Sequence, residues 1–264
     1  MRVLALGDIV GRPGRTMVSD HIGDLLSQYR PDFVLANGEN AASGMGITRD
    51  TADELFSCGI DVLTMGNHVW DKKEVFDFID DEPRILRPLN YPEGAPGRGF
   101  GVFKAAGSLQ VGVISLAGRV FSPAHLDCPF RLADKAVAVL SQDTPIIILD
   151  FHAEATSEKI AMAWYLDGRV SAVLGTHTHV QTADEQVLPS GTGYITDLGM
   201  TGPSHSVIGV KTDLVLRHFL TQLPTRFEVA KGPRILCGVV VDIDEMTGKC
   251  RHLSRIFLSD NAVC

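Results

Sequence analysis

Short apolar runs alternate with polar and amphipathic segments from residue 3 to residue 179 of the chain. Five of these runs have the length and composition of buried strands, and each stops at residue types that bind metal ions. The residues at the five stops are Asp8, Glu39 with Asn40, Asn67 with His68, His152, and His177 with His179. In open α/β sheets, ligands bind in the crevice beyond the carboxyl ends of the strands. The pattern therefore predicts one site that is assembled from distant parts of the chain.

The segments between the early strands have the pattern of helices. An apolar stripe from Met17 to Tyr29 predicts a helix that follows a glycine-rich loop at 11–14 and ends at Pro31. Further helices are expected at 50–58 and 71–80. Alternating strands and helices indicate βαβ units around a largely parallel sheet, and right-handed crossovers would bring the strand ends to one side.

The second half of the chain adds hairpins to this arrangement. Hairpins are expected at 99–105 with 109–116 and at 234–243 with 250–258, helices at 132–141 and 158–166, and strands at 146–150 and 170–174. Hairpins that follow βαβ units indicate a second sheet packed on the first. We therefore expect an α/β fold with two packed β-sheets. No linker or low-complexity stretch divides the chain, so we expect a single domain over residues 1–264.

The overall charge narrows the classes of partner. The chain has 264 residues, of which 45% are hydrophobic and 21% are charged, and its net charge is −8. An acidic chain argues against stable binding of nucleic acid, which usually requires a basic stripe. A small anionic substrate is still compatible with this charge, because bound cations can dominate the local field.

The cysteines and the apolar runs indicate the compartment. The five cysteines are Cys58, Cys128, Cys237, Cys250 and Cys264. They are scattered and form no Cys-x-x-Cys pair, so we expect reduced thiols rather than disulfides. The chain enters its first strand without the features of a signal peptide, and no apolar run approaches the about 20 residues that span a bilayer. We therefore expect a soluble, cytoplasmic protein that does not contact membranes.

His177 and His179 form a pair of candidate metal ligands. In an extended segment, side chains two residues apart point to the same side, with Cα atoms about 6.6 Å apart. This spacing allows both rings to bind one ion, or each to bind one of two ions roughly 3.5–4 Å apart. The alternative is one imidazole at the surface and one hydrogen-bonded structural imidazole.

The other strand ends supply carboxylate, amide and imidazole groups. This set contains no thiolate, so it favours hard or borderline divalent ions such as manganese, iron or zinc. Each member has a structural alternative when it is taken alone. Asp8 has the alternative of capping a turn or helix, Asn37 to Asn40 that of a polar turn, and His152 that of a buried structural histidine.

The remaining polar residues are assigned less specific roles. Asp197 is a candidate for orienting a ligand histidine, and His205 stays undecided between a site and a loop role. The histidines assigned to ordinary structural positions are His21, His125, His218 and His252.

The order of the five blocks resembles the calcineurin-like metallophosphoesterase superfamily. Its blocks read Asp-x-His, Gly-Asp-x-x-Asp, Gly-Asn-His-Asp/Glu, a single His and Gly-His-x-His. The details resemble one branch, the YmdB-like bacterial phosphodiesterases, in which the second block reads Asn-x-Glu-Asn and the third Gly-Asn-His-x-Trp. In this chain the two blocks are Asn37-Gly-Glu39-Asn40 and Gly66-Asn67-His68-Val-Trp70. Similar segments surround His152, His177 and Thr201-Gly-Pro203, so the resemblance runs from residue 3 to about residue 210.

The resemblance implies a four-layer α/β/β/α sandwich, with two mixed β-sheets flanked by helices, and a binuclear metal centre. One ion would be held by Asp8, Glu39, Asn40 and His179, and the other by Glu39, Asn67, His152 and His177. The two divalent or trivalent ions are expected to be iron or manganese, with zinc or magnesium as alternatives. The superfamily has His two residues after the first Asp, whereas this chain has Val10 there, so Asn40 is expected to replace that imidazole.

The activity that the resemblance implies is hydrolysis of small phosphodiesters, with 2′,3′-cyclic nucleotides as the expected substrates. A metal-bridging hydroxide would attack phosphorus, and unligated His68 would protonate the leaving oxygen as general acid. Arg119 is assigned either to the substrate phosphate or to a structural ion pair. The resemblance also implies a homo-oligomer, because the related proteins look oligomeric.

Three other functions stay open at this point. Amidohydrolases also use His-x-His, but the pair follows the first strand of a barrel with eight βα units, and this chain shows fewer. A phosphomonoesterase or nucleotidase would have the same site as a phosphodiesterase. A non-enzymatic regulator would keep the metals, although a purely structural site would not require the unligated His68.

Overall fold

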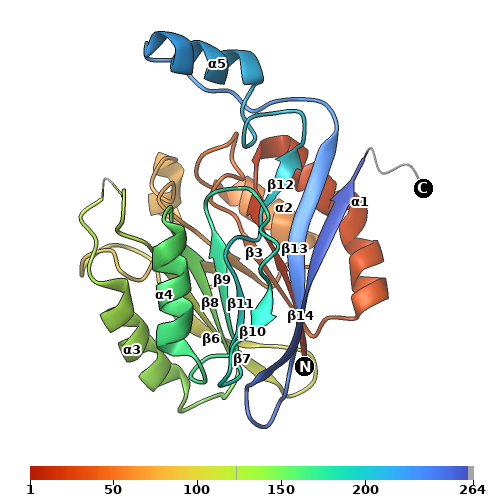
Figure 1. Ribbon diagram of the computed structural model, residues 1–264, viewed down its shortest axis with the longest axis vertical. Coiled ribbons are helices and arrows are strands. Elements are labelled where there is room, and N and C mark those ends of the chain that lie inside the picture. The colour runs from red at the N-terminus through yellow and green to blue at the C-terminus, as the bar shows by residue number, and fades with distance from the viewer. Residues whose placement is uncertain (123, 261–264) are drawn as a thin grey trace.

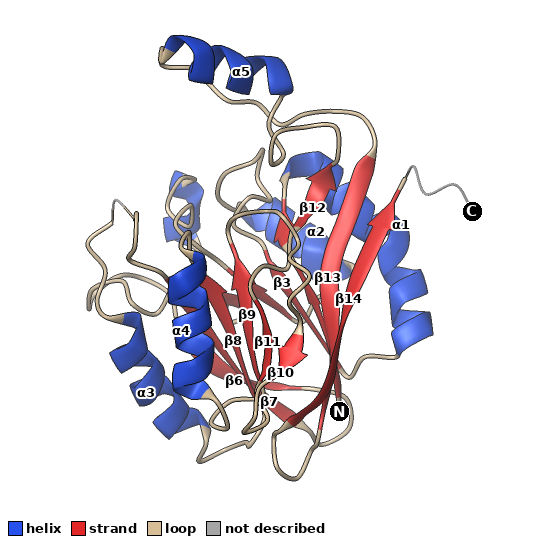
Figure 2. Ribbon diagram, viewed as in Figure 1, coloured by secondary structure: helices blue, strands red, loops and turns tan. Residues whose placement is uncertain are grey.

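The structure is a computed structural model, and it describes residues 1–122 and 124–260. Two β-sheets pack face to face in the centre of the molecule (Figure 1). Helices α1 (Gly11–Tyr29) and α2 (Arg49–Ser57) cover the outer face of one sheet, and α3 (Pro129–Leu140) and α4 (Thr156–Leu166) cover the outer face of the other (Figure 2). This arrangement confirms the expected sandwich of two mixed sheets flanked by helices.

The first sheet has eight strands and the second has six. In spatial order, the first contains β2 (Asp8–Ile9), β12 (Met200–Pro203), β13 (Arg234–Ile243), β1 (Arg2–Leu6), β3 (Phe33–Asn37), β4 (Val62–Thr64) and β5 (Ile85–Leu86), with β14 (Cys250–Ser259) also paired to β13. The second contains β10 (Gln186–Val187), β11 (Gly193–Ile195), β9 (Ala172–Thr176), β8 (Ile147–His152), β7 (Gln110–Ala117) and β6 (Phe100–Lys104). Both are open sheets, which disfavours the barrel of an amidohydrolase.

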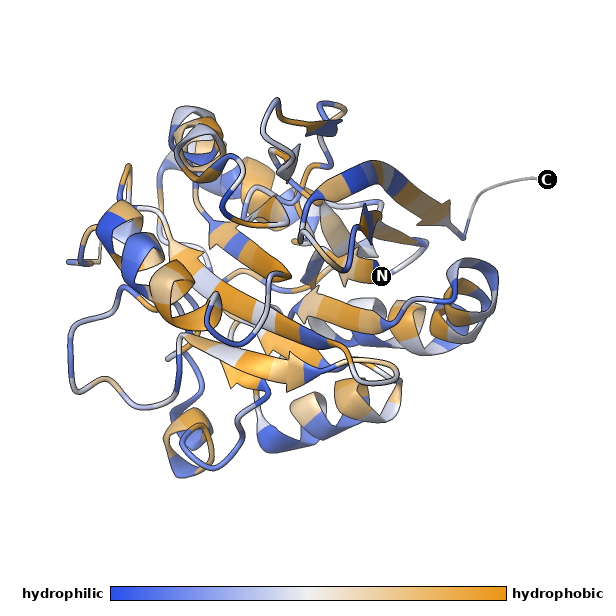
Figure 3. Ribbon diagram, turned by 90° about the horizontal axis from the view of Figure 1, so that it is seen from below, coloured by the Kyte–Doolittle hydropathy of each residue, from blue (hydrophilic) through white to orange (hydrophobic). Residues whose placement is uncertain are grey.

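Three apolar cores separate the four layers. Successive side chains of a strand point to opposite faces, so each central strand contributes to two cores. Leu4 and Leu6 of β1 pack towards the helices, whereas Val3 and Ala5 pack between the sheets. In the second sheet, Ile148 points between the sheets and Leu149 points towards α3 and α4. Figure 3 shows the strands as mostly hydrophobic and the helices with hydrophilic positions on their outward faces.

The parallel strands bring their carboxyl ends together. In the first sheet β1, β3 and β4 are parallel neighbours, and in the second sheet β7, β8 and β9 are parallel neighbours. The residues that follow these strands therefore meet at one edge of the sandwich, as the sequence pattern predicts.

The expected glycine-rich loop at 11–14 is wrong, because these residues form the first turn of α1. Gly11 donates its backbone N–H to the carbonyl oxygen of Asn40 at 2.8 Å. A Cβ atom on Gly14 would lie 2.3 Å from the carbonyl oxygen of Thr201. The two glycines therefore allow close packing at the start of a helix rather than a flexible loop.

The other differences concern short or exposed elements. The expected helix at 71–80 is reduced to a 3₁₀ helix, η1 (Lys73–Asp77), followed by turns. The sequence pattern also missed α5 (Thr212–Thr221), which stands apart from the layers at the top of Figure 1. Short strands such as β2, β5 and β10 have too few residues to show a period.

The four cysteines of the described residues form no disulfide with one another. Cys58, Cys128, Cys237 and Cys250 are free thiols, and Cys264 lies outside the described residues. None of the helices in the described ranges combines the length and apolar character needed to cross a membrane.

Candidate metal centre

Four potential ligand groups converge at the carboxyl ends of β3, β4, β8 and β9. The ring nitrogen Nε2 of His152 lies 3.0 Å from Glu39 Oε1, 3.1 Å from Asn67 Oδ1 and 2.9 Å from His177 Nδ1. Glu39, His152 and His177 can each offer one ligand atom within 4.8 Å of the others. Side chains from distant parts of the chain thus form one cluster, as the sequence pattern predicts.

The protonation of His152 follows from the hydrogen bonds behind it. Thr176 Oγ1 donates its hydrogen to Asp150 Oδ1 at 2.6 Å, so it must accept a hydrogen from His152 Nδ1, which lies 2.9 Å away. Asp150 also accepts hydrogen bonds from Asn37 Nδ2 at 3.0 Å and from Thr64 Oγ1. With the hydrogen of neutral His152 on Nδ1, the lone pair of Nε2 points into the cluster.

His177 is oriented in the same way. Its Nε2 lies 3.1 Å from Glu154 Oε2, so that nitrogen carries the hydrogen and Nδ1 directs its lone pair towards His152. Three electron-pair donors, one ring nitrogen and two oxygens, therefore lie at hydrogen-bond distance from the lone pair of His152 Nε2. Such lone pairs repel each other unless a cation lies among them, and the set of nitrogen and oxygen donors fits a borderline divalent ion.

A second group of ligand atoms lies beside the first. Asp8, Glu39 and Asn40 are buried, and the oxygens Asp8 Oδ1 and Asn40 Oδ1 have no hydrogen-bond partner among the described residues. His179 Nε2 lies 3.8 Å from Asp8 Oδ1. Buried carboxylate and amide oxygens without partners are costly, and a bound cation would satisfy them. These residues therefore also fit a metal ion, with more oxygen ligands than the first group.

The pKa values show how strongly these groups interact. Burial alone would raise the pKa of Glu39, but the positive charge of His152 and its hydrogen bond lower it to about 2. Burial alone would lower the pKa of His152, but Glu39, Asp8 and Asp150 raise it to about 9. Burial raises the pKa of Asp8 to about 6 and lowers that of His177 to about 3. Without metal, His152 therefore carries the proton that compensates the buried carboxylates.

His68 lies at the rim and not among the converging ligand atoms. Its backbone N–H donates to Glu39 Oε2 at 3.1 Å, whereas its ring nitrogen Nδ1 lies 2.7 Å from Asp71 Oδ2. The His68 side chain is 30% exposed, which leaves the second ring nitrogen free to face a substrate. An imidazole that is held by a carboxylate on one nitrogen can exchange a proton through the other.

The paired histidines do not lie in an extended segment, so the expected strand geometry is wrong. His177 and His179 both have left-handed backbone conformations, with φ values of 100° and 66°. The bend is fixed by Asp197, whose Oδ2 accepts hydrogen bonds from the backbone N–H and hydroxyl of Thr178 and from Lys159 Nζ. Asp197 therefore orients the backbone between the two histidines and does not contact either ring.

Arg119 and His205 lie on the surface. Arg119 is exposed, and its side chain forms no ion pair with any described residue. Its backbone N–H donates to Glu158, which fixes the loop at 118–120. His205 is exposed in the loop after β12 and does not join the ligand cluster.

Glycines allow the ligands to approach one another. A Cβ atom on Gly66 would lie 2.2 Å from His152 Cδ2 and 2.3 Å from Glu39 Oε2. A Cβ atom on Gly7 would lie 1.8 Å from the carbonyl oxygen of Gly199, directly before Asp8. Only glycine fits at these two positions. The glycine of the Gly-Asn-His block is therefore required by close packing, whereas its Asn and His are required by the chemistry of the site.

A small pocket opens onto the cluster. It has a volume of about 80 Å³, and its walls include Asn67, His152, His177 and the loop from Gly118 to Ser122. Phe121 of this loop is 85% exposed. The pocket is large enough for a phosphate-sized group and lies next to the ligand atoms.

The sequence pattern missed the residues that orient the ligands. Thr64, Thr176 and Thr178 form the hydrogen bonds described above, yet threonine at the end of a strand is too common to indicate a site. Asp150 and Lys159 lie near His152 in the sequence, but no role was predicted for them. The signal that could have found Asp150 is a charged residue inside an otherwise apolar strand.

The chain is similar to known proteins along nearly its whole length. A family model described as "YmdB-like protein" matches residues 4–256. The chain is 53% identical to a curated protein of Bacillus subtilis strain 168 named "2′,3′-cyclic-nucleotide 2′-phosphodiesterase", over 99% of this chain and 98% of that protein. Its structure is similar to the crystal structure of a hypothetical protein from Thermus thermophilus, with a TM-score of 0.92, 42% identity and coverage of 98% and 99% of the two chains. A phosphatase structure from Mycoplasma pneumoniae matches with a TM-score of 0.92, 34% identity and coverage of 98% and 93%.

Proposed function

The chain belongs to the YmdB-like protein family, and from this membership we propose that it is a metal-dependent phosphodiesterase that hydrolyses 2′,3′-cyclic nucleotides. The observation that carries the proposal is the convergence of Glu39, Asn67 and His177 on the Nε2 atom of His152. In our assignment, one ion is held by Glu39, Asn67, His152 and His177, and the other by Asp8, Glu39, Asn40 and His179. Glu39 is the shared ligand.

Bound metal ions would supply Lewis acidity towards the phosphoryl oxygens and would lower the pKa of water at the site. The protein supplies the other parts of the reaction. Loop 118–122 and the ligand cluster enclose the pocket that receives the phosphoryl group. His68 donates a proton to the departing ester oxygen, and Asp71 holds the His68 ring in place. Water thus adds one P–O bond, one ester P–O bond breaks, and the leaving oxygen is released as a hydroxyl group.

The substrate assignment rests on the relative from Bacillus subtilis, because the match at 53% identity covers nearly all of both chains. Iron or manganese is the metal we assign, since a mixed set of imidazole, amide and carboxylate donors suits both. The free cysteines suit a reducing compartment, so we assign the protein to the cytoplasm. We treat residues 1–264 as one domain and as the subunit of a homo-oligomer.

The deciding experiment is metal analysis of purified protein combined with a substrate panel. The panel contains 2′,3′-cyclic AMP, a linear phosphodiester and 3′-AMP as a monoester. We expect two equivalents of iron or manganese per chain and hydrolysis of the cyclic diester at a higher kcat/KM than the monoester. A faster monoester reaction would assign the site to a phosphatase, as in the name of the Mycoplasma pneumoniae structure. Absence of turnover on every ester in metal-replete protein would contradict an enzymatic role.

A further inference from the structure

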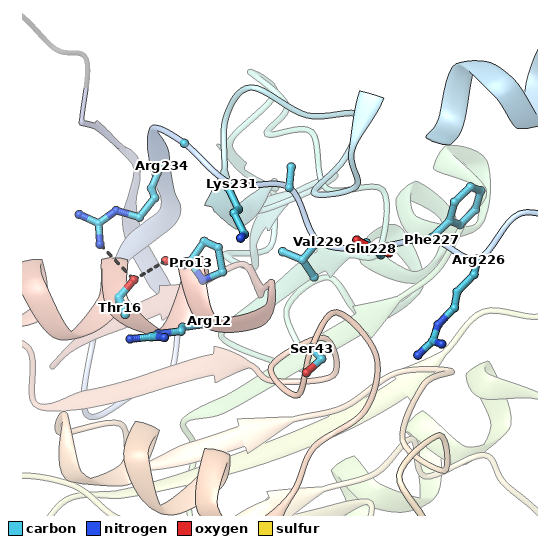
Figure 4. A pocket seen from close by; sticks show the side chains of 12 residues that line it. Arg12, Pro13, Thr16, Ser43, Arg226, Phe227, Glu228, Val229, Lys231 and Arg234 are labelled. Atoms are coloured by element: carbon cyan, nitrogen blue, oxygen red, sulfur yellow. Dashed lines mark hydrogen bonds between the residues drawn. The ribbon is translucent and has the colours of Figure 1, made fainter. Parts of the chain in front are cut away.

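A second, larger cavity lies outside the metal centre. It is a cleft of about 760 Å³ between the first turn of α1 and the segment at 226–234 that leads into β13. Its lining includes four basic residues, Arg12, Arg226, Lys231 and Arg234. Figure 4 shows Lys231 and Arg226 extending from the 226–234 segment towards α1 and the loop that carries Ser43. The cleft is therefore basic, although the chain as a whole has a net charge of −8.

Three of these cations have no ion-pair partner in the part of the chain that the structure describes. Arg12, Arg226 and Lys231 form no ion pair with any residue of the described ranges, whereas Arg234 is paired with Asp20 and Asp260. The single acidic residue of the lining, Glu228, is paired with Lys211 and attracts Arg226 and Lys231 more weakly. Positive charges that outnumber the acidic groups around a cavity repel one another, and an anion in the cavity would relieve this repulsion. The amino-terminal end of α1, at Arg12, adds to the positive potential.

An aromatic side chain lines the same cleft. Phe227 is 44% exposed, and its ring meets the ring of His218 edge-on, with centroids 5.6 Å apart. Figure 4 shows the Phe227 ring extending towards α5 and Arg226 extending towards the loop that carries Ser43. Aromatic rings and cations on one binding segment are typical of sites for single-stranded nucleic acid, because bases stack on the rings and phosphates contact the cations.

The cleft and the metal centre share a wall. Arg12 is four residues after Asp8, and a chain of four residues spans at most about 14 Å. Ser43 lies on the loop that begins at Asn40, and this loop is joined to α1 by the hydrogen bond from Gly11 to Asn40. A ligand in the cleft would therefore lie close to a ligand at the metal centre.

We propose that the cleft between α1 and residues 226–234 binds the internal phosphates of a short single-stranded RNA whose 2′,3′-cyclic end lies at the metal centre. This inference rests on the proposed function, because it extends the cyclic mononucleotide to an oligonucleotide with the same terminal group. The same water addition opens the terminal ring, and the internal phosphodiesters remain intact. Three unpaired cations can bind two or three phosphates. A site of this size does not require the long basic stripe found in proteins that track along nucleic acid.

The test measures binding separately from catalysis. A fluorescently labelled tetraribonucleotide with a 3′-phosphate, the product of the proposed ring opening, serves as the probe for the metal-loaded protein. Neutralising three phosphates of a single strand gives a slope of about −2 for log affinity against log salt, so binding weakens about 20-fold between 50 and 200 mM salt. In the double variant Arg226→Ala/Lys231→Ala, the slope should fall to about −0.7 and the weakening to about threefold. Both residues are exposed, so their truncation leaves the core intact.

A matched control removes the same charge elsewhere. Lys104→Ala/Arg131→Ala changes two exposed residues on β6 and α3, on the other side of the sandwich, and should leave the slope unchanged. Phe227→Ala should weaken binding about tenfold at every salt concentration with no change in slope, because stacking is lost and the charge is kept. An unchanged slope in Arg226→Ala/Lys231→Ala, or the same change in both double variants, would overturn the proposal.

Kinetics separate this inference from the proposed function. The wild type should show a lower KM for a tetranucleotide with a 2′,3′-cyclic end than for 2′,3′-cyclic AMP, and Arg226→Ala/Lys231→Ala should raise only the KM of the tetranucleotide. If neither substrate is hydrolysed while the binding slope behaves as expected, the proposed function fails and the cleft assignment stands. If 3′-AMP alone shows the slope and its loss in the variant, the cleft binds a mononucleotide, and the oligonucleotide assignment is wrong.

Discussion

Lys159 Nζ lies 2.7 Å from Asp197 Oδ2, and both side chains are buried behind the bend that carries His177 and His179. Asp197 also holds Thr178 through that bend. Removing one member of a buried ion pair leaves the other charge without compensation, whereas replacing both by apolar groups is often tolerated. The pair therefore links the stability of the fold to the position of two candidate ligands.

We expect Lys159→Met to lower the free energy of unfolding by about 3–5 kcal/mol, measured by urea denaturation. The double variant Lys159→Met/Asp197→Leu should recover part of this loss, because no buried charge remains unpaired. It should nevertheless retain less metal than the wild type, because Thr178 loses its acceptor. A single variant as stable as the wild type would show that the pair has no structural role.

His68→Ala should leave the metal content unchanged and reduce kcat on 2′,3′-cyclic AMP by about 10²–10⁴-fold, the usual contribution of a general acid. Asp71→Asn should cause a smaller reduction, because the ring stays present but loses the carboxylate 2.7 Å from Nδ1. His205→Ala is the control, since His205 is exposed and lies outside the cluster. Loss of metal from His68→Ala would make His68 a ligand instead of the acid.

Glu39→Gln should abolish both metal retention and hydrolysis while the protein stays folded. The substitution keeps the shape of the side chain but removes the charge that lies against His152 and, in our assignment, is shared by two ions. Glu154→Gln is the matched control. Glu154 is paired with the outer nitrogen of His177 and does not belong to the ligand cluster of the described residues, so its loss should weaken metal affinity about 10–100-fold without abolishing binding. Normal turnover in Glu39→Gln would refute the shared-ligand assignment.

Much of the site follows from local sequence, and the rest depends on contacts between distant residues. Four candidate ligands lie at or shortly after the ends of strands: Asp8, Glu39, Asn67 and His152. The carboxyl ends of parallel strands meet at one edge of a sheet, which brings these residues together. The bend at His177 was not predicted, because it is held by Asp197, which lies 19 positions after Thr178. No local pattern encodes such a contact.

The same distinction applies to the fold. The strands and the amphipathic helices were predicted because burial on one or two faces leaves a period in the sequence. The start of α1 was predicted as a loop because two glycines close together usually indicate a loop. Here Gly11 and Gly14 are required instead by the close approach of Asn40 and Thr201. The helix α5 was missed because it stands outside the layers and Val215 is its one buried residue.

The pH dependence of the metal-free protein should report on His152. Its pKa is raised to about 9 from the ordinary 6.5, so the folded state binds the proton more tightly than the unfolded state. The resulting stabilisation is fully present below pH 6.5 and is lost as the pH rises through 9. The raised pKa of Asp8, about 6, and the lowered pKa of His177, about 3, act below that window. Between pH 6.5 and 9, the free energy of unfolding should fall by up to about 1.4 kcal/mol per pH unit.

This fall is measurable by urea denaturation in the presence of a chelator. The metal-loaded protein should not show it, because a ligand histidine is already deprotonated. Metal affinity should correspondingly rise with pH up to about 9, as the proton on His152 competes less. A metal-free protein with constant stability across this window would contradict the assigned proton on His152.

Gly66→Ala should remove metal binding through shape alone. The added Cβ atom would lie 2.2 Å from His152 Cδ2 and 2.3 Å from Glu39 Oε2, so these two side chains must separate. No charge or ligand atom changes, and Gly66 has no left-handed backbone that an alanine would strain. Gly23→Ala is the control, because Gly23 lies in α1 with open space around its Cα and should gain about 0.5–1 kcal/mol of stability with full metal content. A fully metal-loaded Gly66→Ala protein would show that the cluster can expand. The distance between Glu39 and His152 would then not depend on close packing at Gly66.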